Sequence, residues 1–296
     1  VSRLAARRFL RRALALDAPL PDLGVALDRF GYVQIDPINI CGRMHDLILR
    51  HRVAGYREGD LMRYLHGGDD DRPDDATGAR AAATPDGPAG RPTLPANERR
   101  AFEHHVPGTG ILVAFPLEAG PHLRGAMRGW AVGRGAGAGR LTPREAALAD
   151  TLLAEIAARG PLGSEDFDDP RRGRRVWGAA TLVKATLQKL FFHGRVLIAQ
   201  RRKNRRRYDL PERVLPAKVR SCPPPSPAET ARWLALLKLR QRRLVTLKKD
   251  ELHRVADAVQ LVAIEDCPPL FCLREDVPLL LETANRPSET GNSLTL

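Results

Sequence analysis

Two polar residues, Gln34 and Asp36, flank the apolar residue Ile35. Asp36 precedes a proline, and the residue before a proline is biased toward extended backbone. In an extended segment, residues two apart face the same side, so Gln34 and Asp36 would share one face while Ile35 turns into the core. A carboxylate presented in this way can stabilise developing positive charge and activate water, and a neighbouring amide can orient that water. The structural alternative is that Asp-Pro simply starts a turn.

A second chemical feature is a tract of positive charge. Residues 171–207 hold thirteen Lys and Arg and no Asp or Glu, in a chain of 296 residues with a net charge of +13. A solvated surface normally interleaves both signs, so a tract of one sign predicts contact with phosphates and a double-stranded DNA partner. RNA satisfies the same electrostatics and stays open. The predicted DNA-binding side chains are Lys184, Lys189, Arg195, Arg201, Arg202, Lys203, Arg205, Arg206 and Arg207.

The elements that would position this tract lie in residues 141–216. Thr142 and Glu145 have the spacing of a capping box at the start of a helix. A later helix, from about 179 to 193, ends at Gly194, and two short strands then flank a basic turn at 201–207. Helices followed by a hairpin follow the winged-helix order, in which the third helix enters the major groove and the hairpin is the wing.

The flanking regions suggest similar small modules. Near the N-terminus we predict helices over 2–16 and 22–30 and extended segments over 32–36 and 47–53. Core residues are expected at Phe102, 111–113, Phe115 and Trp130. The fold class is therefore predicted as α+β and predominantly helical, with tandem winged-helix modules and small β-hairpins. The predicted division is an N-terminal module (1–66), a disordered acidic, Pro- and Gly-rich insertion (67–97), a connecting segment with a Gly-rich linker (98–140), the central winged helix with its basic wing (141–216), a C-terminal winged-helix-like module (217–285) and a disordered tail (286–296).

Composition argues against metal and membrane roles. The four cysteines form no CxxC pair and the eight histidines form no HExxH motif, so we expect no metal and no cofactor. There is neither a long apolar run nor a signal-peptide pattern, which predicts a cytoplasmic protein without a membrane partner. The Arg-rich start of the chain could be a transit peptide, but its apolar residues keep helical spacing, which favours a packed first helix.

Two stretches together resemble a known family. Residues 31–53, GYVQIDPINICGRMHDLILRHRV, and residues 177–216, WGAATLVKATLQKLFFHGRVLIAQRRKNRRRYDLPERVLP, are similar to the bacterial winged-helix DNA glycosylases of the YcaQ/AlkZ-like group. The stretch 208–216 is the most distinctive. That group excises alkylated purines and can unhook interstrand crosslinks, which implies DNA repair in the cytoplasm, at the bacterial nucleoid. Its catalytic signature is Gln, an apolar residue, then Gln or Asp.

The resemblance implies roles for individual residues. Asp36 would stabilise the oxocarbenium-like sugar and activate water, and Gln34 would orient the water or bind the sugar-phosphate. His45 and Asp46 would line the same cleft, although His45 could instead cap a strand. The basic hairpin around 201–207 would hold the damaged duplex. No lysine lies within 34–36, so a monofunctional glycosylase is expected rather than a Schiff-base lyase.

The resemblance also has a departure that leaves an alternative open. After Phe102 and Glu103 the family continues to a His and an acidic residue, where this chain has Pro107 and Gly108. The chain could therefore be a non-catalytic winged-helix DNA-binding protein, either a transcriptional regulator or an inactive glycosylase homologue. Regulators usually dimerise to match half-sites, and the absence of a heptad seam predicts a monomer. An RNA-associated basic protein is a third interpretation, although aromatic residues are few.

Overall fold

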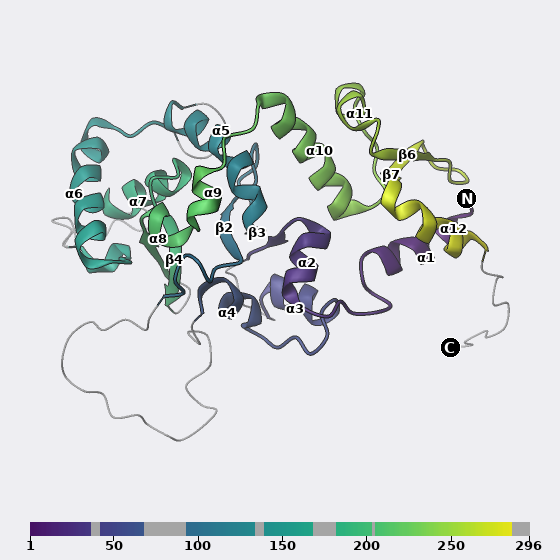
Figure 1. The fold of residues 1–296 in the computed structure, drawn as a ribbon, viewed down its shortest axis with the longest axis horizontal. Coiled ribbons are helices and arrows are strands. Elements are labelled where there is room, and N and C mark those ends of the chain that lie inside the picture. The colour runs from purple at the N-terminus through teal and green to yellow at the C-terminus, as the bar shows by residue number, and fades with distance from the viewer. Residues whose placement is uncertain (37–41, 68–92, 134–138, 168–181, 203–204, 286–296) are drawn as a thin grey trace, which may run out of the picture.

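A computed structural model describes residues 1–36, 42–67, 93–133, 139–167, 182–202 and 205–285 (Figure 1). The helices are α1 (Arg3–Ala13), α2 (Leu23–Phe30), α3 (Met44–Arg50), α4 (Asp60–His66), α5 (Gly120–Ala131), α6 (Pro143–Arg159), α7 (Leu182–Phe192), α8 (Pro211–Val214), α9 (Ala217–Ser221), α10 (Pro227–Arg242), α11 (Lys249–Val255) and α12 (Val277–Asn285). The strands are β1 (Val33–Gln34), β2 (Ala101–His105), β3 (Leu112–Pro116), β4 (Leu197–Arg202), β5 (Arg205–Asp209), β6 (Val259–Val262) and β7 (Leu270–Leu273). This mixed α+β, mostly helical architecture with small antiparallel hairpins confirms the predicted fold class.

A three-stranded antiparallel sheet in the order β1-β3-β2 carries the Gln-Ile-Asp segment. Gln34 lies opposite Val113, and Val113 lies opposite His104. Val113 and the next apolar residue of β3 on the same face, Phe115, are fully buried in the largest hydrophobic cluster, which also contains Phe102. The sheet is therefore anchored through β3, while β1 forms one of its edges.

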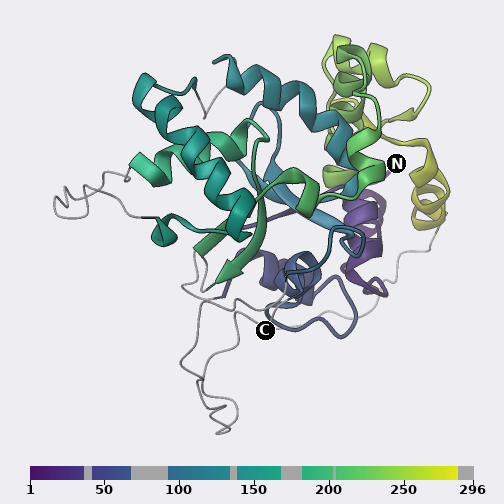
Figure 2. The ribbon, with the colours of Figure 1, turned by 60° about the vertical axis from the view of Figure 1, so that its left-hand side comes forward.

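The central segment combines α6, a 3-10 turn (Ser164–Asp166) and α7 with the β4–β5 hairpin, so the second helical element of the predicted winged-helix order is a single short turn. The capping box is confirmed, because the Thr142 hydroxyl accepts from the Glu145 amide and the Glu145 carboxylate accepts from the Thr142 amide. Helix α7 buries Leu187, Leu190 and Phe191 against the main cluster. Figure 2 shows the green hairpin beside the central blue strands, and β4 packs against β2.

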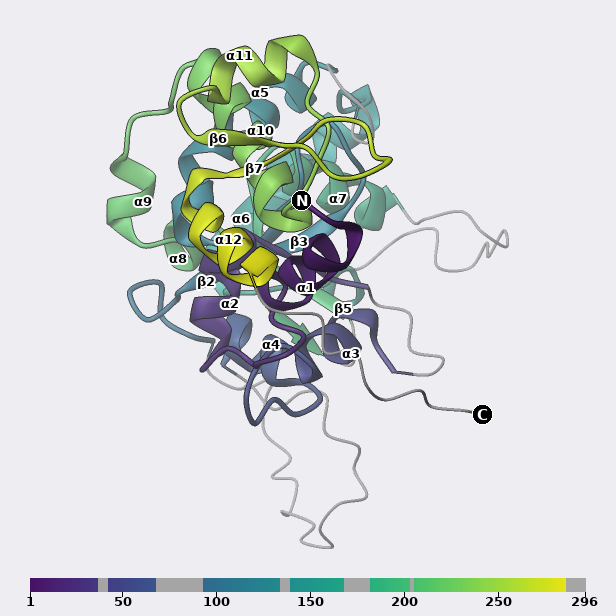
Figure 3. The same cartoon turned by 90° about the vertical axis from the view of Figure 1, so that its right-hand side faces the viewer.

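Helix α1 packs with the C-terminal part of the chain. Its side chains Ala6, Phe9 and Ala13 share a cluster with Cys272 of β7 and Leu280 of α12. Figure 3 shows α1 and α12 side by side below the β6–β7 hairpin. The N-terminal ammonium of Val1 also donates to the carbonyl of Ala263 at 2.9 Å. The first helix, which the predicted division groups with residues 1–66, thus contributes its core face to the C-terminal module.

The end of α10 ties the C-terminal module to the start of β1. The Gln241 side-chain amide donates to the carbonyl oxygens of Phe30 (2.6 Å) and Tyr32 (2.8 Å). Arg243 donates to the carbonyl of Arg29 at 2.8 Å and forms a buried ion pair with Asp276 at 3.1 Å. These bonds fix the backbone immediately before the Gln-Ile-Asp segment, so the position of β1 depends on a helix about 200 residues further along the chain.

Two local predictions are wrong. Residues 47–53 are not an extended segment, because Met44–Arg50 form α3. The side chains of His45, Asp46 and Leu49 lie on the buried face of this helix. A short apolar run fits a strand or a buried helix face equally well, and here tertiary packing favours the helix. Ile111, predicted as core, is 39% exposed. Most of the predicted insertion (67–97) and all of the tail (286–296) lie outside the described residues.

The described residues were also compared with the requirements of a membrane span and of a metal site. No helix in the described part of the chain is long and apolar enough to cross a membrane. In the same ranges, no group of three or more His, Cys, Asp or Glu side chains could hold a metal ion. The free thiols of Cys222 and Cys267 are exposed, and that of Cys272 is buried.

Candidate active site and nucleic-acid interface

Gln34 and Asp36 lie at the end of the edge strand β1. The Ile35 amide donates to the Leu112 carbonyl at 2.9 Å, and the Ile35 side chain is only 4% exposed. Gln34 is exposed and Asp36 is half-buried. The alternation of side chains along extended backbone therefore places the amide and the carboxylate on one face, with Ile35 as the anchor between them.

His45 and Asp46 lie in the interior of α3 and do not face an open cleft. Asp46 is 3% exposed, and its Oδ1 accepts from the Tyr56 hydroxyl at 2.5 Å and from the Gly59 amide at 3.1 Å. Burial and the bond to Asp46 raise the pKa of Tyr56. His45 is 1% exposed, and burial lowers its pKa despite the nearby Asp46, so its ring is neutral at pH 7. The Asp46 carboxylate therefore holds the loop after α3 in place through its bonds to Tyr56 and Gly59.

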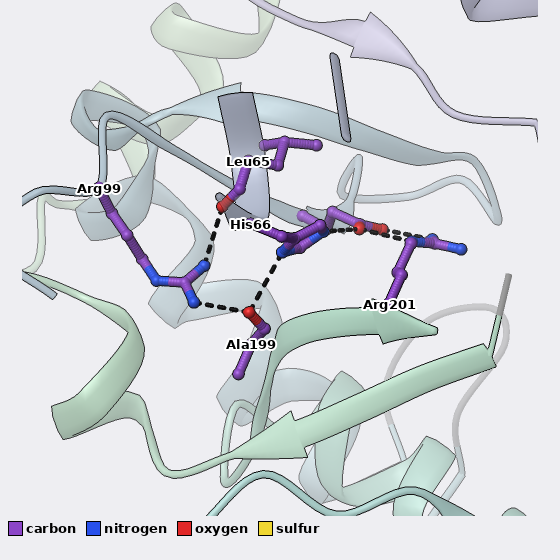
Figure 4. A network of polar contacts seen from close by, with 6 residues as sticks. Leu65, His66, Arg99, Ala199 and Arg201 are labelled. Carbon is purple, nitrogen blue, oxygen red and sulfur yellow. Dashed lines mark hydrogen bonds and ion pairs between the residues drawn. The ribbon is translucent and has the colours of Figure 1, made fainter. Parts of the chain in front are cut away.

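A buried charge network connects the sheet to the basic hairpin (Figure 4). Glu103 of β2 is 1% exposed, and its two oxygens accept from Arg201 of β4, at 2.7 Å from Nε to Oε1 and 2.5 Å from Nη2 to Oε2. His66 of α4 lies 2.7 Å from the same carboxylate through Nε2. Burial raises the pKa of Glu103, but the charge and hydrogen bonds of Arg201 and the His66 bond outweigh burial and hold it far below its usual range.

Arg99 extends this network to α4 and β4. It donates to the carbonyl of Leu65 at 3.0 Å and to that of Ala199 at 2.6 Å (Figure 4). Burial lowers the pKa of Arg99 to about 10, so the side chain stays charged at neutral pH. Strands β2 and β4 and helix α4 are therefore held together by ion pairs and charge-assisted bonds as well as by packing.

Two side chains predicted to bind DNA form ion pairs and hydrogen bonds inside the protein. Arg201 belongs to the Glu103 network, and Arg207 pairs with Asp166 at 2.8 Å while donating to the Pro161 carbonyl. Their side chains are only 5% and 10% exposed, so the structure directs these two predicted residues into the protein. The strands extend through most of the predicted basic turn, and strand alternation turns part of its arginines inward.

Two further predicted residues are paired nearer the surface. Lys189 donates to Glu145 at 2.6 Å, and Arg195 lies 3.6 Å from Asp150 with both side chains well exposed. The Glu145 carboxylate also caps α6, and the bonds from Lys189 and Thr142 lower its pKa in spite of burial. Exposed pairs of this kind contribute little to stability, so Arg195 can exchange Asp150 for a phosphate at small cost.

The remaining basic side chains mark the candidate DNA-facing surface. Arg202 and Arg205 are exposed and lie directly opposite each other near the tip of the hairpin. Arg206 lies over the Phe191 ring at 6.0 Å, and Lys184 is exposed on α7. Lys203 lies outside the described residues, between these two strands in the sequence. The hairpin tip is thus the densest exposed cationic element of the predicted set.

Replacing both Arg202 and Arg205 with Ala should weaken duplex binding at all sequences. Each phosphate contact releases about 0.9 counterions, so the slope of log K against log salt should fall by about 1.8 for two contacts. Fluorescence anisotropy at several salt concentrations measures this slope. The matched control replaces the exposed Lys248 and Lys249 of the α11 region, which removes the same charge from another part of the fold. An unchanged slope in the hairpin variant would exclude these arginines from the interface.

Two buried histidines should make the fold sensitive to mild acid. Burial lowers the pKa of His104 to about 4 and that of His105 to about 3. Below about pH 6.5 these histidines are protonated in the unfolded chain but remain neutral in the folded chain. The free energy of unfolding therefore decreases as the pH is lowered, by about 1.4 kcal/mol per pH unit for each histidine. Urea unfolding between pH 7 and pH 5 should show this loss. His105→Leu should reduce the slope, and substitution of the exposed His253 by Leu should leave it unchanged.

A large cavity lies elsewhere on the molecule. It has a volume of about 830 Å³, and acidic side chains on its lining include Asp22, Asp28, Glu98 and Glu118. Burial and the neighbouring Glu118 raise the pKa of Asp28. Neither Gln34 nor Asp36 lines this cavity. The Gln-Ile-Asp segment therefore faces a separate part of the surface.

Comparison with known proteins adds a family and a fold. A family model described as DNA glycosylase AlkZ-like matches residues 78–254, which is more than half of the chain. The solved structure of Streptomyces sahachiroi DNA glycosylase AlkZ is similar with a TM-score of 0.56 at 15% sequence identity. The match covers 94% of this chain and 71% of that chain. At this identity the structural likeness concerns the fold, and the family match begins after Asp36 in the sequence.

Proposed function

Because the chain belongs to the AlkZ-like DNA glycosylase family, we propose that it hydrolyses the N-glycosidic bond of N7-alkylated purines in double-stranded DNA. The observation that carries this proposal is the pair of Gln34 and Asp36 on one face of an edge strand, fixed by the buried Ile35. The exposure of Gln34 also suits a bulky substrate. We therefore include interstrand crosslinks among the proposed substrates.

The chemistry requires little from the protein beyond a positioned carboxylate. An N7-alkylated purine is already cationic, so its bond to C1′ breaks with the electron pair moving onto the base, which leaves as a neutral molecule. The Asp36 carboxylate stabilises the positive charge that develops on the sugar. It then accepts a proton from the attacking water as the water oxygen bonds to C1′. Gln34 orients that water, and the products are the free base and an abasic site.

The basic hairpin binds the phosphates of the duplex. Arg202 and Arg205 near its tip contact phosphates, and the adjacent Arg201 is fixed on Glu103 of the same sheet that carries Gln34. The hairpin and the catalytic strand are therefore rigidly connected through β2 and β3. Phosphate contacts set the register of the protein on DNA, which is what a reaction at one nucleotide needs.

A comparison of two lesions tests the proposed substrate class. One duplex carries a single N7-methylguanine, which is cationic, and the other carries hypoxanthine, which is a neutral damaged purine. We expect an alkali-sensitive abasic site only in the first, because the mechanism gives no acid assistance to a neutral leaving base. Tight, salt-sensitive binding to both duplexes without any abasic site would instead support a non-catalytic DNA-binding protein. Equal cleavage of both would contradict the proposed chemistry.

A further inference from the structure

The residue that faces Asp36 across the sheet follows from the strand register. Gln34 pairs with Val113, and the Ile35 amide bonds to the Leu112 carbonyl. Continuing this antiparallel register by one position places Asp36 opposite Ile111. Residues directly opposite each other point to the same face, with Cβ atoms about 4.5–5.5 Å apart. Ile111 is thus the cross-strand neighbour of the proposed catalytic carboxylate.

Ile111 is an apolar residue without a core position. Its side chain is 39% exposed, whereas its neighbours Leu112 and Val113 are 7% and 0% exposed. On the face that Gln34 shares with the buried Val113, Gln34 and Ile111 are therefore exposed and Asp36 is half-buried. An isolated exposed isoleucine is common, but this one adjoins the two polar residues that the proposed reaction uses.

The backbone holds Ile111 in a fixed position. The Thr109 hydroxyl donates to the Val106 carbonyl at 3.0 Å and accepts from the Ile111 amide at 3.1 Å. The Val106 amide donates to the Ile111 carbonyl at 3.0 Å, and Gly108 supplies the positive φ of 76° that this tight turn needs. The turn from Val106 to Ile111 is therefore closed by its own hydrogen bonds, which fix the backbone of Ile111 at the start of β3.

We propose that Ile111 is a substrate-contacting residue, which packs against the deoxyribose of the target nucleotide while Asp36 acts on C1′. This inference rests on the proposed function, because it places the target nucleotide at Asp36. An apolar side chain there contacts the C–H face of deoxyribose without pairing with the carboxylate. It also excludes water on that side, and electrostatic stabilisation by Asp36 is stronger in the resulting low-dielectric environment.

The test measures recognition separately from chemistry. It compares binding of the full chain to an undamaged duplex and to the same duplex with one tetrahydrofuran abasic analogue, which cannot react. We expect the wild type to prefer the abasic duplex and Ile111→Ala to lose about tenfold of that preference, because the variant loses apolar contact area. Ile111→Val should keep the preference within about twofold, since most of that area remains. The matched control is Leu261→Ala on the β6–β7 hairpin, where Leu261 is 53% exposed.

The outcomes separate this inference from the proposed function. A preference that persists in Ile111→Ala overturns the contact, even if the wild type releases base. A wild type without any preference also overturns it, because no displaced nucleotide would then sit beside Asp36. Loss of the preference in Ile111→Ala, together with no base release by the wild type, would support the contact and reject the catalysis. Equal losses in Ile111→Ala and Leu261→Ala would contradict a specific role for Ile111.

Discussion

Asp36→Asn should abolish release of N7-methylguanine while leaving binding to the same duplex within about twofold. Asparagine keeps the size and hydrogen-bonding capacity of the side chain but can neither carry the negative charge nor accept the proton of water. Removing a general base costs about 10²–10⁴-fold in rate, and the loss of charge stabilisation at the sugar adds to this. Single-turnover kinetics with protein in excess over DNA measure the chemical step directly.

The control for this variant is a second Asp→Asn change at an exposed position. Asp266 is exposed on the C-terminal module and has a positive φ of 52°, which asparagine also tolerates. Asp266→Asn changes the net charge by the same amount and should keep the wild-type rate. If Asp36→Asn retained a rate within about threefold of the wild type, Asp36 would not be the catalytic carboxylate.

The second large effect concerns stability. Glu103→Ala should destabilise the fold by about 3–5 kcal/mol, because it leaves Arg201 buried without its counter-charge. Arg201 is 5% exposed and Glu103 is 1% exposed, so water cannot replace the missing carboxylate. Urea unfolding at pH 7 measures the loss as a shift in the midpoint.

A surface pair provides the comparison for Glu103. Glu155 and Arg159 form an ion pair at 3.1 Å with both side chains nearly half exposed. Glu155→Ala should cost at most about 0.5 kcal/mol, as expected for an exposed pair on a helix. A double replacement of Glu103 and Arg201 by Met should recover most of the stability lost in Glu103→Ala, since a packed apolar pair can replace a buried ion pair. A cost below about 1 kcal/mol for Glu103→Ala would show that the network is not a structural anchor.

Local signals in the sequence predicted local structure well. The predicted cap at Thr142 is present, and the helices predicted to begin at residues 2 and 22 begin one residue later, with Ser2 and Asp22 as their N-caps. The alternation around Ile35 likewise predicted which side chain would be buried. These features depend on neighbours within a few residues, so the sequence contains the information needed to predict them.

The inward turn of the basic residues could not be predicted in the same way. Glu103 lies 98 residues before Arg201 in the sequence, and Asp166 lies 41 residues before Arg207. A single sequence does not show that these charges meet, so all the arginines of the tract seemed equally available for DNA. The packing of α1 against the C-terminal module could not be predicted for the same reason, since Phe9 packs against residues more than 250 positions away.

Ile111 illustrates a third kind of limit. Its apolar neighbours made it a candidate core residue, yet it lies in the turn that precedes the central strand β3 and is 39% exposed. The pairing of β1 with β3 reaches the residue next to it in register, since the Ile35 amide donates to the Leu112 carbonyl. The position proposed for Ile111 opposite Asp36 depends on pairing between strands more than 75 residues apart, which the hydrophobic pattern alone does not predict.

The most direct test of the proposed activity is to identify the products. The full chain is incubated in excess with a duplex that carries one N7-methylguanine, and both the free bases and the DNA strands are analysed by mass spectrometry. We predict one equivalent of free N7-methylguanine and an uncleaved strand with an abasic site at that position, without any added metal or nucleotide. Saturated binding with the methylated base still attached would contradict the proposed glycosylase activity at Gln34 and Asp36.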